Sequence, residues 1–247
     1  MTTRRILLVL LLVCISCKPS QQRQQQAKPA AGPRTKATVV TVRTTIQPAN
    51  RTIDHELTIF GGRARSSSES ETWRLYDLEK KTVTFVDDVE KTIRTETLDA
   101  LIAKRKAALE QPLRRDVPVA RFAATNEQKT IQGVPSTKSV VRAGKYTREL
   151  WIGKHPQIPP SLFAMMMASE TPTSPLAPMM RAAEEKLVTV EGYPMVDRAE
   201  LPYDNKTMVV ERSVVSVAQK EVQESALAVP RDYKDITPKP KPKAKAD

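Results

Sequence analysis

The sequence predicts an α+β fold dominated by a single large curved antiparallel β-sheet, half-barrel-like, with a few short helices on its concave side. Two observations indicate this fold. Short β-branched or alternating apolar segments recur between polar turns along most of the chain, whereas only three segments have a helical period. With 7 glycines in 247 residues, the chain also lacks the glycine-rich loops that cradle phosphates.

The first half is expected to form an antiparallel meander. The β-branched segment 36–48 is the first strand, and 52–60 follows with Ile53, His55, Leu57 and Ile59 alternating onto one face. After the turn Gly61-Gly62, the polar stretch 63–71 can form an exposed edge strand. Tight polar turns at 77–81 and 87–91 then separate three short strands, 73–76, 82–86 and 92–97.

The period changes at residues 98–110, where Leu98, Leu101, Ile102 and Leu109 fall near one helical face. Thr97 can cap this helix and Pro112 can stop it. The second half returns to strands with a helical interruption. Its expected strands are 119–125, 129–132, 136–143, 146–152, 188–190, 208–219 and 221–228, and its expected short helices are 161–168 and 176–187.

The N-terminus has the pattern of an export signal. Arg4 and Arg5 precede an apolar run of about ten residues, too short to span a membrane comfortably as a mature helix. The run ends at Ser16-Cys17, which resembles a bacterial lipoprotein signal, in which a small residue precedes a cysteine that becomes the acylated first residue. Cys14 fits this rule poorly because it follows Val13. A soluble secreted protein and an uncleaved signal anchor remain the alternatives.

These features divide the chain into a lipoprotein signal peptide (1–17), a Gln- and Pro-rich tether (18–36), a β domain (37–236) and a basic Pro/Lys tail (237–247). Acylation of Cys17 would leave no thiol in the mature domain, because Cys14 is the only other cysteine. The expected address is the cell envelope, facing the periplasm, with the membrane as partner through the anchor. Lys18 is not the Asp that marks inner-membrane retention in some bacteria, which favours the outer membrane.

The net charge of +12 does not indicate a specific nucleic-acid partner. Residues 1–36 hold seven basic and no acidic residues, and 230–247 hold six basic and three acidic ones, which leaves 27 basic and 25 acidic residues between them. A folded duplex binder would carry a basic face, whereas this excess lies in the terminal segments. Such segments meet anionic lipid or polymer non-specifically.

No catalytic residue, metal site or cofactor is predicted, because no hydrolase, zinc-protease or nucleotide-binding motif is present. The two histidines, His55 and His155, are too few for a three-histidine metal site. The acidic pairs Asp87-Asp88 and Glu184-Glu185 are interpreted as solvated turn and helix surface, since adjacent residues do not face each other.

A methionine cluster is the candidate ligand site. Two short helices carry Met165, Met166 and Met167, and Met179 and Met180. Methionine is adaptable, so these side chains can line a pocket for an acyl chain or another apolar ligand. The alternatives are that they fill the core of the sheet, or that their thioethers bind copper.

The order of several motifs resembles an uncharacterised family of bacterial lipoproteins, a domain of unknown function whose sheet is similar to that of the Lol-type periplasmic lipoprotein carriers. The motifs are YDLEKKTVTFVD, TIQGVPSTKSVV, YTRELWIGK, EGYPM and LAVPRDYKDI. The resemblance covers residues 37–236 and implies a curved sheet around helices, with no assigned catalytic residue. The expected function is non-enzymatic binding of an apolar ligand, such as a lipid, or of a protein partner. The alternative is a structural envelope protein that contacts lipid headgroups or wall polymer through its basic tails.

Overall fold

The computed structural model describes residues 32–67, 71–110, 119–170, 177–203 and 206–238. Twelve strands are assigned in this part of the chain. They are β1 (Arg34–Gln47), β2 (Arg51–Phe60), β3 (Arg63–Ser67), β4 (Thr72–Asp77), β5 (Thr82–Asp87), β6 (Thr92–Thr97), β7 (Arg121–Ile131), β8 (Val134–Ala143), β9 (Tyr146–Gly153), β10 (Tyr193–Tyr203), β11 (Lys206–Gln223) and β12 (Lys234–Asp235). The helices are α1 (Leu98–Glu110), α2 (Leu162–Ser169), α3 (Ala177–Leu187) and the short 3₁₀ helix η1 (Glu224–Leu227).

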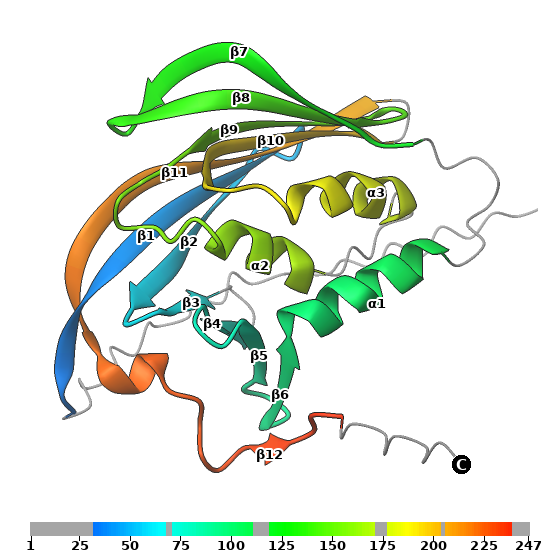
Figure 1. Cartoon of the computed structure of the whole chain (residues 1–247). Coiled ribbons are helices and arrows are strands. Elements are labelled where there is room, and N and C mark those ends of the chain that lie inside the picture. The colour runs from blue at the N-terminus through cyan, green and yellow to red at the C-terminus, as the bar shows by residue number, and fades with distance from the viewer. Residues whose placement is uncertain (1–31, 68–70, 111–118, 171–176, 204–205, 239–247) are drawn as a thin grey trace, which may run out of the picture. The chain divides into compact units, whose positions relative to one another are not determined.

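All twelve strands belong to one open sheet, in the order β12-β6-β5-β4-β3-β2-β1-β11-β10-β9-β8-β7 (Figure 1). Two meanders make up this sheet, β1 to β6 and β7 to β11, and they meet where β1 pairs with β11 from Arg34↔Gln223 to Gln47↔Val209. Only the β12–β6 pair is parallel among these strands. The expectation of a mostly-β protein built on one large sheet is therefore confirmed.

The main core lies between one face of the sheet and the three α-helices. Sheet residues such as Val40, Leu57 and Tyr76 join one cluster with residues of α1, α2 and α3. Each helix contributes large buried side chains to it: Leu101 of α1, Leu162, Phe163 and Met165 of α2, and Leu187 of α3. Burial of these side chains stabilises the domain by about 1.5–3 kcal/mol each.

Arg105 links the three helices by hydrogen bonds inside the core. The Arg105 guanidinium, on α1, donates hydrogen bonds to the Glu184 carboxylate of α3 and to the main-chain carbonyls of Met167 and Glu170 at the end of α2. A cation at a helix C-terminus also meets the negative end of the helix dipole. Burial raises the pKa of Glu184, against the opposing effect of Arg105.

A second, smaller cluster covers the other face of the sheet. Trp73, Leu75 and Val86 pack there against Val229 and Tyr233 of the C-terminal segment. Two hydrogen bonds join at Asp88, which accepts one from Trp73 Nε1 at 3.1 Å and one from the Tyr233 hydroxyl at 2.8 Å. The segment after β11 is thereby fixed along β4, β5 and β6, and β12 extends the sheet beside β6.

The observed elements differ from the expected ones at five places. The two expected strands 208–219 and 221–228 are one strand, β11, which ends at Gln223 and is followed by the 3₁₀ helix η1. Residues 63–67 form an interior strand, β3, between β2 and β4, and not an edge. The two expected strands 119–125 and 129–132 are one strand, β7, with a register irregularity between Ala124 and Gln128. Residues 188–190 are not a strand, and β10 was not expected as a strand.

The helix at 98–110 is confirmed with the expected boundaries, and the Thr97 hydroxyl accepts a hydrogen bond from the Ala100 amide at 3.2 Å as its cap. The expected signal peptide, Cys17 and the tether as far as residue 31 lie outside the described residues, as do residues 239–247 of the basic tail. Among the described residues, no helix is both long and apolar enough to cross a membrane.

Candidate ligand-binding site

A cavity of about 240 Å³ lies between α2 and the sheet. Its walls come from β1, β2, β3 and β4 of the first meander, from β10 and β11 of the second, and from α2. The lining residues are Val42, Thr44, His55, Glu56, Leu57, Ser66, Ser67, Arg74, Tyr76, Phe163, Met166, Met167, Glu170, Tyr193, Pro194, Asp197 and Arg212. The cavity therefore exists only where the two meanders are joined.

Aromatic and thioether side chains provide the apolar part of the wall. The rings of Phe163 and Tyr193 meet edge to face, with their centroids 6.3 Å apart and an interplanar angle of 75°. Tyr76, from β4, is completely buried, and its hydroxyl lies 3.5 Å from Ser169 Oγ at the end of α2. Packed rings of this kind give a rigid apolar surface with few rotatable bonds.

One polar atom in the wall has no partner. Thr44, on β1, is only 6% exposed, and its hydroxyl makes no hydrogen bond with any described residue. A buried hydroxyl without a partner costs about 1–3 kcal/mol relative to a satisfied one. Because Thr44 lines the cavity, a ligand or water with a polar group there would remove that cost.

A buried ion pair forms the floor beside β10. Arg148 of β9 binds Asp197 through two parallel hydrogen bonds, Nε to Oδ1 at 2.8 Å and Nη2 to Oδ2 at 2.7 Å. Arg212 of β11 lies 3.5 Å from Asp197 Oδ2 and is 43% exposed. Arg148 Nη2 also donates to Met167 Sδ at 3.4 Å, which orients this thioether at the cavity wall.

The five candidate methionines occupy different places. Met166 and Met167 line the cavity. Met165 is 1% exposed and belongs to the core, and Met179 and Met180 on α3 are partly buried against the same core without lining the cavity. The methionines of both helices thus pack in or against the core, and two of them on α2, Met166 and Met167, also line the cavity.

The histidines and acidic pairs are also separated. His55 lines the cavity, whereas His155 Nδ1 accepts a hydrogen bond from the Gln157 amide in the loop before α2. Asp87 caps a turn through the amides of Val89 and Glu90. The interpretation of Glu184 as solvated helix surface is wrong, because Glu184 is buried against Arg105, whereas Glu185 is exposed. No group of three or more His, Cys, Asp or Glu side chains able to hold a metal occurs among the described residues.

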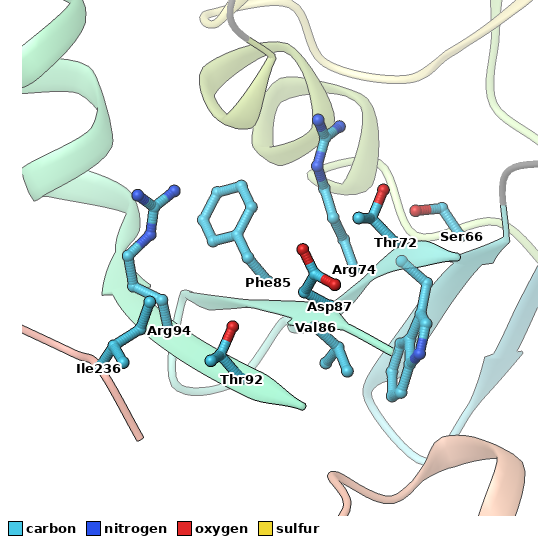
Figure 2. Close-up of a pocket in the computed structure, with 10 residues that line it drawn as sticks. Ser66, Thr72, Arg74, Phe85, Val86, Asp87, Thr92, Arg94 and Ile236 are labelled. Carbon is cyan, nitrogen blue, oxygen red and sulfur yellow. The ribbon is translucent and has the colours of Figure 1, made fainter. Parts of the chain in front are cut away.

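A second, more open groove of about 520 Å³ adjoins the cavity, and Figure 2 shows its lining. It runs over β3, β4, β5 and β6 and shares Ser66 and Arg74 with the cavity. Its prominent side chains are Arg74, Phe85 and Arg94. The sequence analysis singled out none of these three residues, nor Thr44, Phe163 or Tyr193. The one signal in the sequence was a charged residue, Arg74, between the apolar residues Trp73 and Leu75.

The comparisons with known proteins assign no family. No protein-family model matches the chain, and no curated protein matches it. Two solved structures of PNGF-II, in space groups C2 and P21, align with 83% of this chain at 11% and 13% sequence identity and TM-scores of 0.46 and 0.42. The chain spans only 31% and 32% of the length of those structures. At these TM-scores the likeness carries neither fold nor function to this chain.

Proposed function

We propose that this protein is a lipid-anchored cell-envelope protein whose domain binds an apolar molecule, or the apolar part of a larger one, in the cavity under α2. The observation that carries the proposal is the cavity itself. It is walled by Phe163, Met166, Met167 and Tyr193 and retains an unpartnered buried hydroxyl at Thr44. Ligand pockets commonly combine such apolar walls with a few polar groups that orient the ligand.

The size of the cavity limits the ligand. A volume of about 240 Å³ is below the roughly 300–1,000 Å³ of pockets that take drug-sized molecules. It has room for about eight water-sized groups of about 30 Å³. One short stretch of a single hydrocarbon chain meets this limit, whereas a whole two-chain lipid does not.

The envelope address and the carrier-like form of the domain belong to the same proposal. In this proposal the domain is non-enzymatic and resembles an uncharacterised lipoprotein family whose sheet is similar to that of the Lol-type carriers. Its sheet curves around the helices, and Cys17 is acylated at the outer membrane. Intact mass of membrane-extracted protein tests the anchor: Cys17→Ser abolishes the lipid mass and Cys14→Ser does not. An unmodified soluble wild-type chain contradicts it.

Binding of the neutral fluorescent probe N-phenyl-1-naphthylamine tests the cavity. The wild-type domain is expected to bind the probe with increased fluorescence. Met166→Glu places a charge in the apolar wall and is expected to weaken binding at least tenfold, since a difference of about 1.4 kcal/mol gives a factor of ten. Met179→Glu is the matched control, because Met179 lies on a neighbouring helix and does not line the cavity.

The thermal unfolding of both variants is measured alongside the titration, which distinguishes an unfolded variant from a folded variant that no longer binds the probe. Absence of binding to the wild-type domain, or equal loss in the two variants at equal stability, contradicts the assignment of the cavity as the ligand site.

A further inference from the structure

Three side chains form a row across the open groove beside the cavity. Arg74 of β4 is the register partner of Phe85 on β5, and Phe85 is the partner of Arg94 on β6. Directly opposed residues in a sheet project to the same face. Tyr76 of the helix-facing core shares this face, because it lies two residues from Arg74 on β4. The row therefore lies on the face of the sheet that holds the cavity.

The aromatic ring stands between two guanidinium groups. The Phe85 centroid lies 5.6 Å from Arg74 Cζ and 4.6 Å from Arg94 Cζ. Figure 2 shows both guanidinium groups extending to the same side, with the ring between them. Cation–π attraction holds an arginine over an aromatic face while its N–H groups at the edge remain free to donate.

Among the described residues, no carboxylate forms an ion pair with the Arg74 guanidinium. This guanidinium group lies over the Phe85 ring. Arg94 forms an ion pair with Glu96, with Nε 3.1 Å from Oε1, but this Nε–H group has no hydrogen-bond acceptor among the described residues. Glu96 forms a second ion pair with Lys104. The Arg94 side chain is 43% exposed.

Asp87 is the acidic side chain that lines this groove. Its Oδ1 accepts hydrogen bonds from the main-chain amides of Val89 and Glu90, at 3.0 and 2.9 Å, and so closes the turn between β5 and β6. The groove thus presents two guanidinium groups and one carboxylate that already has partners.

The groove and the cavity share two lining residues. Ser66 and Arg74 line both, and Ser66 pairs with Leu57 of the apolar cavity wall. A molecule with its hydrocarbon end against Leu57, Phe163 and Met166 would therefore extend past Arg74 toward Arg94. Along this path the apolar side chains of the cavity are followed by the guanidinium groups of Arg74 and Arg94; the cavity is also lined by the carboxylates of Glu56, Glu170 and Asp197.

We propose that the ligand is an anionic amphiphile, a single chain with a phosphate or carboxylate headgroup, and that Arg74 and Arg94 bind the headgroup. The inference rests on the proposed function, because the chain occupies the cavity described above. Guanidinium groups match the geometry of phosphate and carboxylate oxygens and form charge-assisted hydrogen bonds with them. Phe85 is the positioning residue that holds the two guanidinium groups apart on one side of the groove.

The test compares decyl phosphate, decanoate and decanol, which share one chain and differ in the headgroup, by displacement of N-phenyl-1-naphthylamine. The wild-type domain is expected to bind the two anions at least tenfold more tightly than decanol, and added salt is expected to reduce the difference. The double variant Arg74→Gln/Arg94→Gln is expected to reduce the difference in affinity between the anions and decanol below threefold. Arg198→Gln is the control, because this partly exposed arginine on β10 pairs with Glu200 and lines neither the cavity nor the groove.

The outcomes separate the two proposals. Equal binding of all three compounds, or a preference that survives in the double glutamine variant, overturns the headgroup inference while the cavity remains a ligand site. Failure of all three compounds and of the probe to bind overturns both. If inorganic phosphate competes as strongly as decyl phosphate, the arginines bind a free anion, and the proposal that the ligand is an amphiphile is overturned. Arg74→Lys keeps the charge and is expected to retain part of the preference, which a purely structural role would not predict.

Discussion

At Asp197, two opposing effects act on one carboxyl group. Burial acts to raise its pKa, but the charge and hydrogen bonds of Arg148, with a further contribution from Arg212, outweigh burial, and the pKa of Asp197 is lowered. Asp197 and Arg148 are 5% and 3% exposed, so neither charge has solvent as a substitute partner. The ionised carboxylate is therefore the form that the folded protein stabilises.

Asp197→Asn is expected to destabilise the domain by about 3–5 kcal/mol at neutral pH, because it leaves the Arg148 guanidinium buried without its countercharge. Denaturant unfolding measures the loss. Asp54→Asn removes the exposed partner of Arg43 and is expected to change stability little. A small effect of Asp197→Asn would show that the pair is dispensable.

The same pair predicts how stability depends on pH. Because the pKa of Asp197 is lower in the folded state, its contribution is complete above the unfolded value of about 4 and is lost as the pH falls through the folded value. The stability difference between the wild-type protein and Asp197→Asn should thus be constant from pH 7 to about 5 and shrink below about 4. A difference that grows toward acid pH would contradict the assignment.

Among the elements, the two hairpins β4–β5 and β5–β6 use the same turn. Each begins with an aspartate that accepts a main-chain amide, Asp77 from Lys80 and Asp87 from Glu90, both at 2.9 Å. Each ends with a lysine at positive φ, 51° at both Lys81 and Lys91. A side chain in this left-handed region is strained by about 1–2 kcal/mol relative to glycine.

Lys81→Gly is therefore expected to leave stability unchanged or to raise it by up to about 1 kcal/mol, since relief of strain exceeds the added freedom of glycine in the unfolded chain. Lys80→Gly, in the same turn but without a positive φ, is expected to lower stability by about 0.5–1 kcal/mol. The midpoints of urea unfolding measure both changes. Equal destabilisation by the two glycines would disprove the strain.

These turns and the helix at 98–110 were predictable because their signals are local: alternation, aspartate at the turn and a change to helical period. Strand β10 was not predictable from the sequence, because Pro194 and Pro202 argue against a strand and the charged Asp197 argues against burial. Pro194 lies at a register irregularity, and Arg148 from another strand neutralises Asp197. The register irregularity at Pro194 and the ion pair of Asp197 both depend on residues of a neighbouring strand that are distant in sequence.

The candidate site was hidden for a related reason. On β4, alternation assigns Trp73 and Leu75 to one face and Arg74 and Tyr76 to the other. Both faces are covered, one by the helices and one by Val229 and Tyr233. Because neither face of β4 is fully exposed to solvent, the alternation of its residues could not indicate that Arg74 faces a ligand-sized groove.

The whole molecule depends on the junction between β1 and β11, because it joins the two meanders and contributes Val42, Thr44 and Arg212 to the cavity. Val39 and Val40 of β1 and Val214 of β11 are almost fully buried. Strand β7, by contrast, lies at the edge of the sheet and is exposed along almost its whole length.

Hydrogen exchange is expected to reflect this difference. The amides at the centre of β1 and β11 should exchange only through global unfolding, and those of β7 through local opening at lower free energy. Mass spectrometry of peptic fragments measures both. Two separate unfolding transitions, one for each meander, would show that the junction does not couple them.

The same junction makes the protein suited to fragment complementation. A chain cut between residues 110 and 119 gives one piece with β1 to β6 and another with β7 to β11, and it leaves β1 and β11 as unpaired edge strands. Neither piece alone has both walls of the cavity. Unpaired edge strands form hydrogen bonds with other strands readily, so each half would pair with the other or aggregate. Ligand binding would then measure how much of the protein has reassembled.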